Sequence, residues 1–124
     1  MSDTLTLERV SESAKDDYRF VTKLVIPKAG IRVLDDLSSC VALAKVDLNT
    51  NEISSLAPIG DNSSLAWLNV AHNKLTSLQG VQKLRKLVVL NASHNQITRT
   101  IHIAPLKGDS CTRRPFLNTN ISHN

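Results

Sequence analysis

The chain has 124 residues, of which 41% are hydrophobic and 21% charged, and its formal net charge is +4. This length suffices for one domain, and the composition is that of a globular rather than a disordered chain. No apolar run approaches the roughly 20 residues of a membrane-spanning helix, and the polar, acidic N-terminus is unlike a secretory leader. Two widely separated cysteines are too few for a disulfide framework or a zinc site, so we expect an intracellular location, cytoplasmic or nuclear.

Residues 1–20 form a polar segment in which we expect a short capping helix over residues 4–16. Leu7, Val10 and Ala14 have the spacing i, i+3 and i+7, which places them on one stripe of a helix. A helix of this kind suits the end of a repeat domain, whose apolar side chains need a polar cover. The stripe is narrow and a basic face is missing, which disfavours a helix that binds a membrane surface.

Residues 21–106 repeat one pattern at an interval of 22 residues, in four units that begin near residues 21, 43, 65 and 87. Each unit follows L-x-x-L-x-L-x-x-N-x-L-x-x-L-x-x-L-x-x-L. Three residues depart from it: Ala29 replaces the asparagine, and Asn62 and Thr100 replace apolar residues. A period of this length indicates stacked structural units that share a core.

This pattern resembles the leucine-rich repeats, and its strict 22-residue length resembles the subclass typified by the regulatory subunit of protein phosphatase 1. The resemblance covers residues 21–106. It implies an α/β fold, a right-handed solenoid of about four repeats, with a parallel sheet on the concave side and short helical or 3₁₀ turns on the convex side. A spliceosomal ribonucleoprotein and an axonemal dynein light chain belong to the same subclass.

The residues themselves favour the same architecture. Segments 24–26, 46–48, 68–70 and 90–92 alternate inward and outward positions, as half-buried strands do. The returning segments have L-x-x-L-x-x-L spacing, which suits short 3₁₀ turns, and Pro58 and Pro105 disfavour long helices there. The asparagine after each strand can pair with backbone groups where the chain turns away. We therefore predict a structural asparagine ladder of Asn51, Asn73 and Asn95.

Residues 107–124 form a polar, basic tail with two open interpretations. Leu117–Asn120 repeats the L-x-x-N element, but Asn120 does not fall at the 22-residue interval from Asn95. The tail is therefore either disordered or a degenerate fifth repeat. It could also replace further repeats of a longer relative, as in a shortened isoform.

The period places outward strand residues in columns on the concave wall. Trp67 is the only tryptophan, the phase of the repeat places it outside the core, and tryptophan is enriched at interaction hot spots. We predict a protein-binding surface on this wall, made of Lys23, Lys45, Asp47, Trp67, Asn69, His72, Val89, Asn91 and His94. Four strands give a wall of roughly 250 Å², well below the roughly 800 Å² per partner of a stable interface.

We predict a non-enzymatic protein-interaction module, such as a scaffold or a regulatory subunit. The sequence has no Gly-rich phosphate loop and no nucleophile motif, and a third metal ligand beside His72 and His94 is missing. We expect no catalytic site, metal, cofactor, small-molecule substrate or membrane contact. The resemblance implies a phosphatase catalytic subunit or a cytoskeletal protein as partner. Two alternatives are a ribonucleoprotein component that contacts RNA or an RNA-binding protein, and a shortened isoform without a stable partner.

Overall fold

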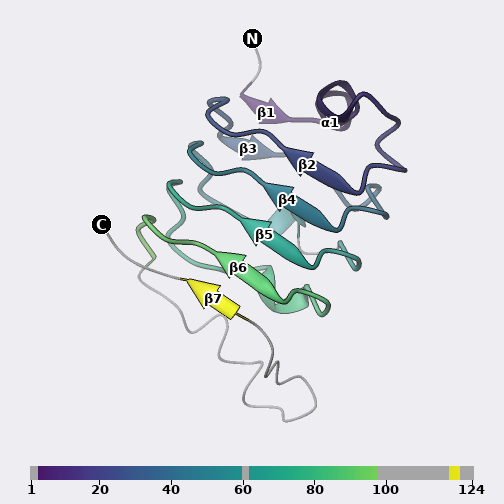
Figure 1. Ribbon diagram of the computed structural model, residues 1–124. Coiled ribbons are helices and arrows are strands. Elements are labelled where there is room, and N and C mark those ends of the chain that lie inside the picture. Colours follow the sequence, from purple (N-terminus) through teal and green to yellow (C-terminus); the bar gives the residue numbers. More distant parts are fainter. Residues whose placement is uncertain (1–2, 60–61, 98–117, 121–124) are drawn as a thin grey trace.

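The computed structural model describes residues 3–59, 62–97 and 118–120, which form a stack of similar turns (Figure 1). Among these residues, five short strands make one parallel sheet, each strand beside the next in chain order. They are β2 (Lys23–Val25), β4 (Lys45–Asp47), β5 (Trp67–Asn69), β6 (Val89–Asn91) and β7 (Asn118–Asn120). The predicted solenoid with a parallel sheet is therefore confirmed.

Strand pairing follows the interval of the sequence from β2 to β6. Leu24 lies opposite Val46, Val46 opposite Leu68 and Leu68 opposite Leu90. All four side chains are buried, with exposed fractions of at most 1%. Because the neighbours of each central residue point outward, β2, β4, β5 and β6 each contribute one apolar side chain to the core and two residues to the outer face.

The last strand departs from this interval. Asn118 of β7 pairs with Val89, and Asn120 pairs with Asn91, which is a longer step than 22 residues. Asn120 therefore aligns with the strand residue Asn91. It does not align with Asn95, the ladder residue to which the L-x-x-N element of the tail would correspond. The sheet has five strands where four were expected. Residues 98–117 and 121–124, which hold most of the tail, lie outside the described part of the chain.

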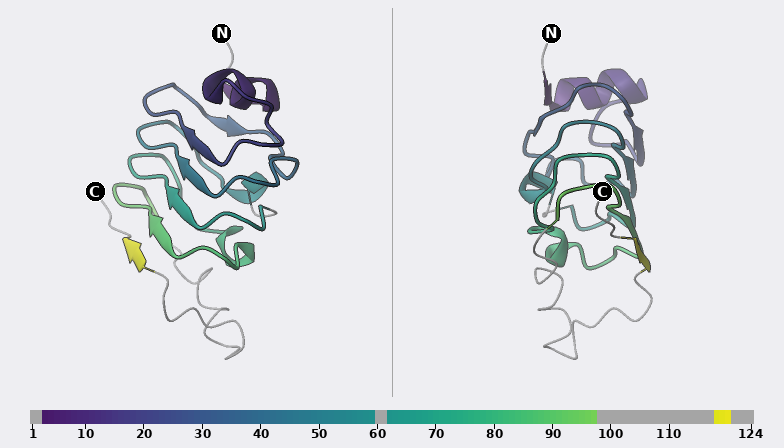
Figure 2. Two further views of the ribbon diagram at one scale, coloured as in Figure 1. Left: turned by 45° about the vertical axis from the view of Figure 1, so that its right-hand side comes forward. Right: turned by 90° about the vertical axis from the view of Figure 1, so that its left-hand side faces the viewer.

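The convex side carries two single-turn 3₁₀ helices, η1 (Ala57–Ile59) and η2 (Val81–Lys83), opposite the sheet (Figure 2). The predicted short convex turns are thereby confirmed. Ile59 and Val81 point inward and are fully buried. Gly80, which precedes η2, has φ +106°, and a Cβ there would lie 3.1 Å from the carbonyl oxygen of Leu56. Glycine therefore allows these two turns to approach closely, in a backbone conformation that other residues rarely adopt.

Helix α1 (Leu7–Ala14) lies across the N-terminal end of the stack (Figure 1). The Thr6 hydroxyl accepts a hydrogen bond from the backbone N–H of Arg9 and caps the helix. Val10 is fully buried against the first turn of the solenoid. Before the helix, β1 (Thr4–Leu5) pairs in parallel with β3 (Val33–Leu34) in a second, two-stranded sheet, which the sequence analysis did not foresee.

Each asparagine that follows a strand binds backbone groups of two neighbouring turns. The Asn73 Nδ2 group donates to the carbonyl oxygens of Leu48 and Val70 at 3.0 Å and of Ala71 at 3.1 Å. Its Oδ1 atom accepts from the backbone N–H of Ile53 at 3.0 Å. One side chain therefore bonds four backbone groups at the corner of the turn, and it is the acceptor of the buried N–H of Ile53.

The asparagine ladder (Asn51, Asn73 and Asn95) is continuous through shared carbonyls. The oxygen of Leu48 accepts from both Asn51 and Asn73, and the oxygen of Val70 accepts from both Asn73 and Asn95. Each asparagine is thus linked to the next through one backbone oxygen. This chain of bonds fixes the spacing of successive turns along the solenoid.

Asn62, which breaks the leucine pattern, is also buried, with 2% of its surface exposed. Its Nδ2 group donates to the carbonyl oxygens of Leu37 and Cys40 in the preceding turn. Its Oδ1 atom is buried and has no hydrogen-bond partner. The departure from the pattern therefore gives Asn62 two bonds and one unpaired acceptor.

Replacement of Asn73 and of Asn62 by leucine should have different effects on stability. Asn73→Leu leaves the buried N–H of Ile53 without its acceptor and should lower the free energy of unfolding by about 2–3 kcal/mol. Asn62→Leu removes an unpaired oxygen, and the carbonyls of Leu37 and Cys40 each keep another backbone donor. It should change stability by less than about 1 kcal/mol. Urea unfolding of both variants measures the difference, and equal losses would contradict the role of the ladder.

Candidate functional site

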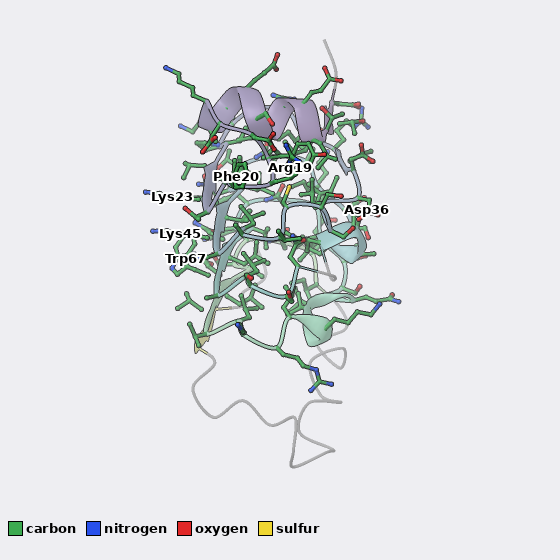
Figure 3. All side chains as sticks on the ribbon, turned by 90° about the vertical axis from the view of Figure 1, so that its right-hand side faces the viewer. Arg19, Phe20, Lys23, Asp36, Lys45 and Trp67 are labelled. Carbon is green, nitrogen blue, oxygen red and sulfur yellow. The ribbon has the colours of Figure 1, made fainter. Side chains whose placement is uncertain are left out.

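The strand register brings four of the predicted site residues into one column. Lys23, Lys45, Trp67 and Val89 each begin a strand, and each pairs with the next along the sheet. Lys23, Lys45 and Trp67 lie one above another and project from the same face of the sheet (Figure 3). We call these four residues the Lys–Trp column.

Trp67 lies outside the core, next to a lysine. The Lys45 Nζ atom is 4.5 Å from the centroid of the Trp67 ring, which is a cation–π contact. Both side chains are half-buried. In the column Trp67 lies between Lys45 on one strand and Val89 on the next, so its neighbours are a cation on one strand and an aliphatic residue on the other.

Further apolar side chains extend the surface around Trp67. Val88 is 44% exposed, and the residues of the preceding turn at the same place, Ala66 and Trp67, are half-buried. The N–H groups of Val88 and Val89 both donate to the carbonyl oxygen of Ala66, which holds the two turns side by side. We define Ala66, Trp67, Val88 and Val89 as the apolar patch.

The sequence analysis missed Val88 as part of this surface. Val88 precedes the outward strand position, where the other repeats carry Thr22, Ala44 and Ala66. The sequence signal for it is a valine at a position where the other repeats carry a small or polar residue. Val25 was also left out of the predicted site, although 45% of it is exposed at the end of β2.

The predicted site residues Asp47, Asn69 and Asn91, which share a column with Val25 at the ends of the strands, close the turns that follow. The Oδ1 atom of each accepts a hydrogen bond from the N–H two residues later, in each case at 3.1 Å. Asp47 Oδ1 also accepts from Asn49 Nδ2 at 2.6 Å. These are Asx turns, so the three side chains stabilise the turns at the edge of the concave wall.

His72 and His94 lie beyond the C-terminal ends of their strands, whereas Trp67 lies at the N-terminal end of its own. Their rings stack, with centroids 4.2 Å apart and planes 10° from parallel. Both residues have φ +57°, and their counterparts Lys28 and Thr50 have similar values of +53° and +56°. This left-handed conformation is uncommon for such residues, and histidine tolerates it better than most. The turn geometry therefore brings the two histidines together.

The described residues contain no group of three or more His, Cys, Asp or Glu side chains able to hold a metal ion. In the same part of the chain, no helix is long and apolar enough to cross a membrane. Cys40 is a free thiol with 1% of its surface exposed, and burial raises the pKa of that thiol above its ordinary value. Cys40 is thus a core residue at a leucine position.

A shallow hollow of about 160 Å³ adjoins the Lys23 end of the column. It is lined by Ala14, Asp16, Phe20, Val21, Thr22 and Lys23. Phe20 is 64% exposed, with the Arg19 guanidinium 5.7 Å from its ring centroid. Arg19 also pairs with Asp17 at 2.8 Å, and its hydrogen bond lowers the pKa of that carboxyl to about 2. The charge of Arg19 is therefore matched locally.

The fold is that of the leucine-rich-repeat proteins. Internalin C2 of Listeria monocytogenes has a similar structure, with a TM-score of 0.59 and 19% sequence identity over 81% of this chain and 51% of that one. The chain therefore spans about half the length of this structure. No family model and no curated protein sequence matches the chain. The resemblance to internalin C2 is one of architecture.

The contact between Lys45 and Trp67 should be measurable as a coupling energy. A double-mutant cycle with Lys45→Met and Trp67→Leu should give about 0.5–1 kcal/mol, the value of an exposed cation–π pair. The matched cycle with Lys23→Met and Trp67→Leu should give a smaller value, because Lys23 lies two strands away from Trp67. Urea unfolding of the single and double variants measures both. Equal couplings would contradict the assigned contact.

Proposed function

We propose that this chain is a non-enzymatic protein-interaction module that binds a protein partner through its concave face, with Trp67 at the centre. The observation that carries the proposal is the apolar patch around Trp67. The chain has a closely packed aliphatic core, yet its only tryptophan lies on the outer face beside an exposed valine. Exposed aromatic residues in apolar surroundings are typical centres of protein interfaces.

The resemblance of the 22-residue repeat to the phosphatase regulatory subunit gives the proposal a first set of partners. A phosphatase catalytic subunit and a cytoskeletal protein, in the cytoplasm or the nucleus, are the candidates to test. Of the predicted site residues, Lys23, Lys45, Trp67 and Val89 would make the contact. The stacked histidines, His72 and His94, would border it at the other end of the strands.

Affinity capture from cell lysate tests this proposal. Trp67→Ala should lose the captured partners, because truncation of a central interface tryptophan costs about 2 kcal/mol or more, roughly a 30-fold loss of affinity. Val33→Ala is the matched control, since Val33 is 53% exposed on the second sheet. Circular dichroism should show that both variants fold. Identical partners for the two variants would refute a concave-face interface at Trp67.

A further inference from the structure

The Lys–Trp column carries two positive charges that are not engaged in ion pairs within the described part of the chain. Among the described residues, neither Lys23 nor Lys45 forms an ion pair, whereas Arg19, Arg32 and Lys74 do. Three acidic groups lie near the two lysines in the chain: Asp17, which pairs with Arg19, Asp16, which lines the hollow beside Lys23, and Asp47, two residues after Lys45. Asp16 Oδ1 accepts from the backbone N–H of Asp17, and Asp47 Oδ1 accepts two hydrogen bonds from Asn49. None of these carboxylates is ion-paired with a lysine of the column, so both ammonium groups can pair with carboxylates of a partner.

The dimensions of the column suit a short extended segment. From Lys23 to Val89 it crosses three gaps between strands, or about 14 Å at roughly 4.8 Å a gap. An extended chain covers that length with about four or five residues at roughly 3.3 Å each. A globular partner would instead need about 800 Å² on this side, which a wall of three-residue strands does not provide.

The order of residues along the column is cation, cation, aromatic, aliphatic. We propose that the column binds an extended acidic segment of a partner protein, with carboxylates at Lys23 and Lys45 and an apolar side chain on the apolar patch. The inference rests on the proposed function, since it specifies the partner chemistry for the same surface. The cation–π contact holds the Lys45 ammonium in place before binding, which reduces the entropy lost when a carboxylate pairs with it.

The surroundings of Trp67 favour an acidic peptide over RNA. Phosphates would also pair with the two lysines, but single-stranded RNA gains much of its affinity from bases that stack on open aromatic faces. Lys45 already lies over the Trp67 ring, and the next residue of the column, Val89, is aliphatic. The neighbouring Val88 and Ala66 offer aliphatic surface, which suits a leucine or phenylalanine of the partner.

Two fluorescent octapeptide libraries test the inference with the full chain. In one, two aspartates are fixed and a leucine or phenylalanine follows within three residues; in the other, asparagines replace the aspartates. At low salt the acidic library should bind about 5 to 30 times more tightly, as expected if each of two exposed ion pairs contributes about 0.5–1 kcal/mol. Lys23→Glu and Lys45→Glu should each abolish this preference. Lys83→Glu, on the convex η2, is the matched control and should preserve it.

Several outcomes would overturn the inference. If Trp67→Ala loses its partners from lysate but the two libraries bind equally, or neither library binds, the inference of an acidic segment is wrong. The proposed function then stands. If neither binds and Trp67→Ala keeps its partners, both fail. If an oligouridine probe binds more tightly than the acidic library and loses affinity in Lys45→Glu, the column is an RNA site. Loss of the preference in Lys83→Glu would show that it reflects net charge alone.

Discussion

The sharing of backbone oxygens between successive asparagines is the constraint on which the rest of the structure depends. Leu48 O and Val70 O each accept from two members of the ladder, so a turn cannot shift along the axis without breaking bonds to both neighbours. These groups are buried, and an unpaired buried donor costs about 1–3 kcal/mol. The ladder therefore fixes the spacing, and the leucine core supplies the greater part of the driving force.

This fixed spacing produces the surface. Once the turns are in register, side chains 22 residues apart lie on adjacent strands, so Lys45, Trp67 and Val89 become neighbours although they are distant in sequence. The same register stacks His72 on His94. A repeat protein thus builds a binding surface by changing outward residues while its buried positions stay alike.

The period of the sequence was enough to predict the parallel sheet and the convex turns, because both follow from which residues point inward. Interactions that do not recur from one repeat to the next could not be predicted from the period. The pairing of β1 with β3 depends on how one N-terminal segment lies against the first turn. The register of β7 depends on backbone pairing with β6, which the composition of Asn118–Asn120 does not encode. Val88 was missed because its exposure depends on the path of the loop before β6.

Native-state hydrogen exchange of three backbone amides tests the central claim most directly. Ile31, Ile53 and Leu75 each donate to the Oδ1 atom of a ladder asparagine. If the ladder holds the turns together as one unit, the three amides should exchange slowly and with similar free energies of opening. Fast exchange at Ile53, the central position, would show that the turns open independently and that the surface built on their register is not fixed.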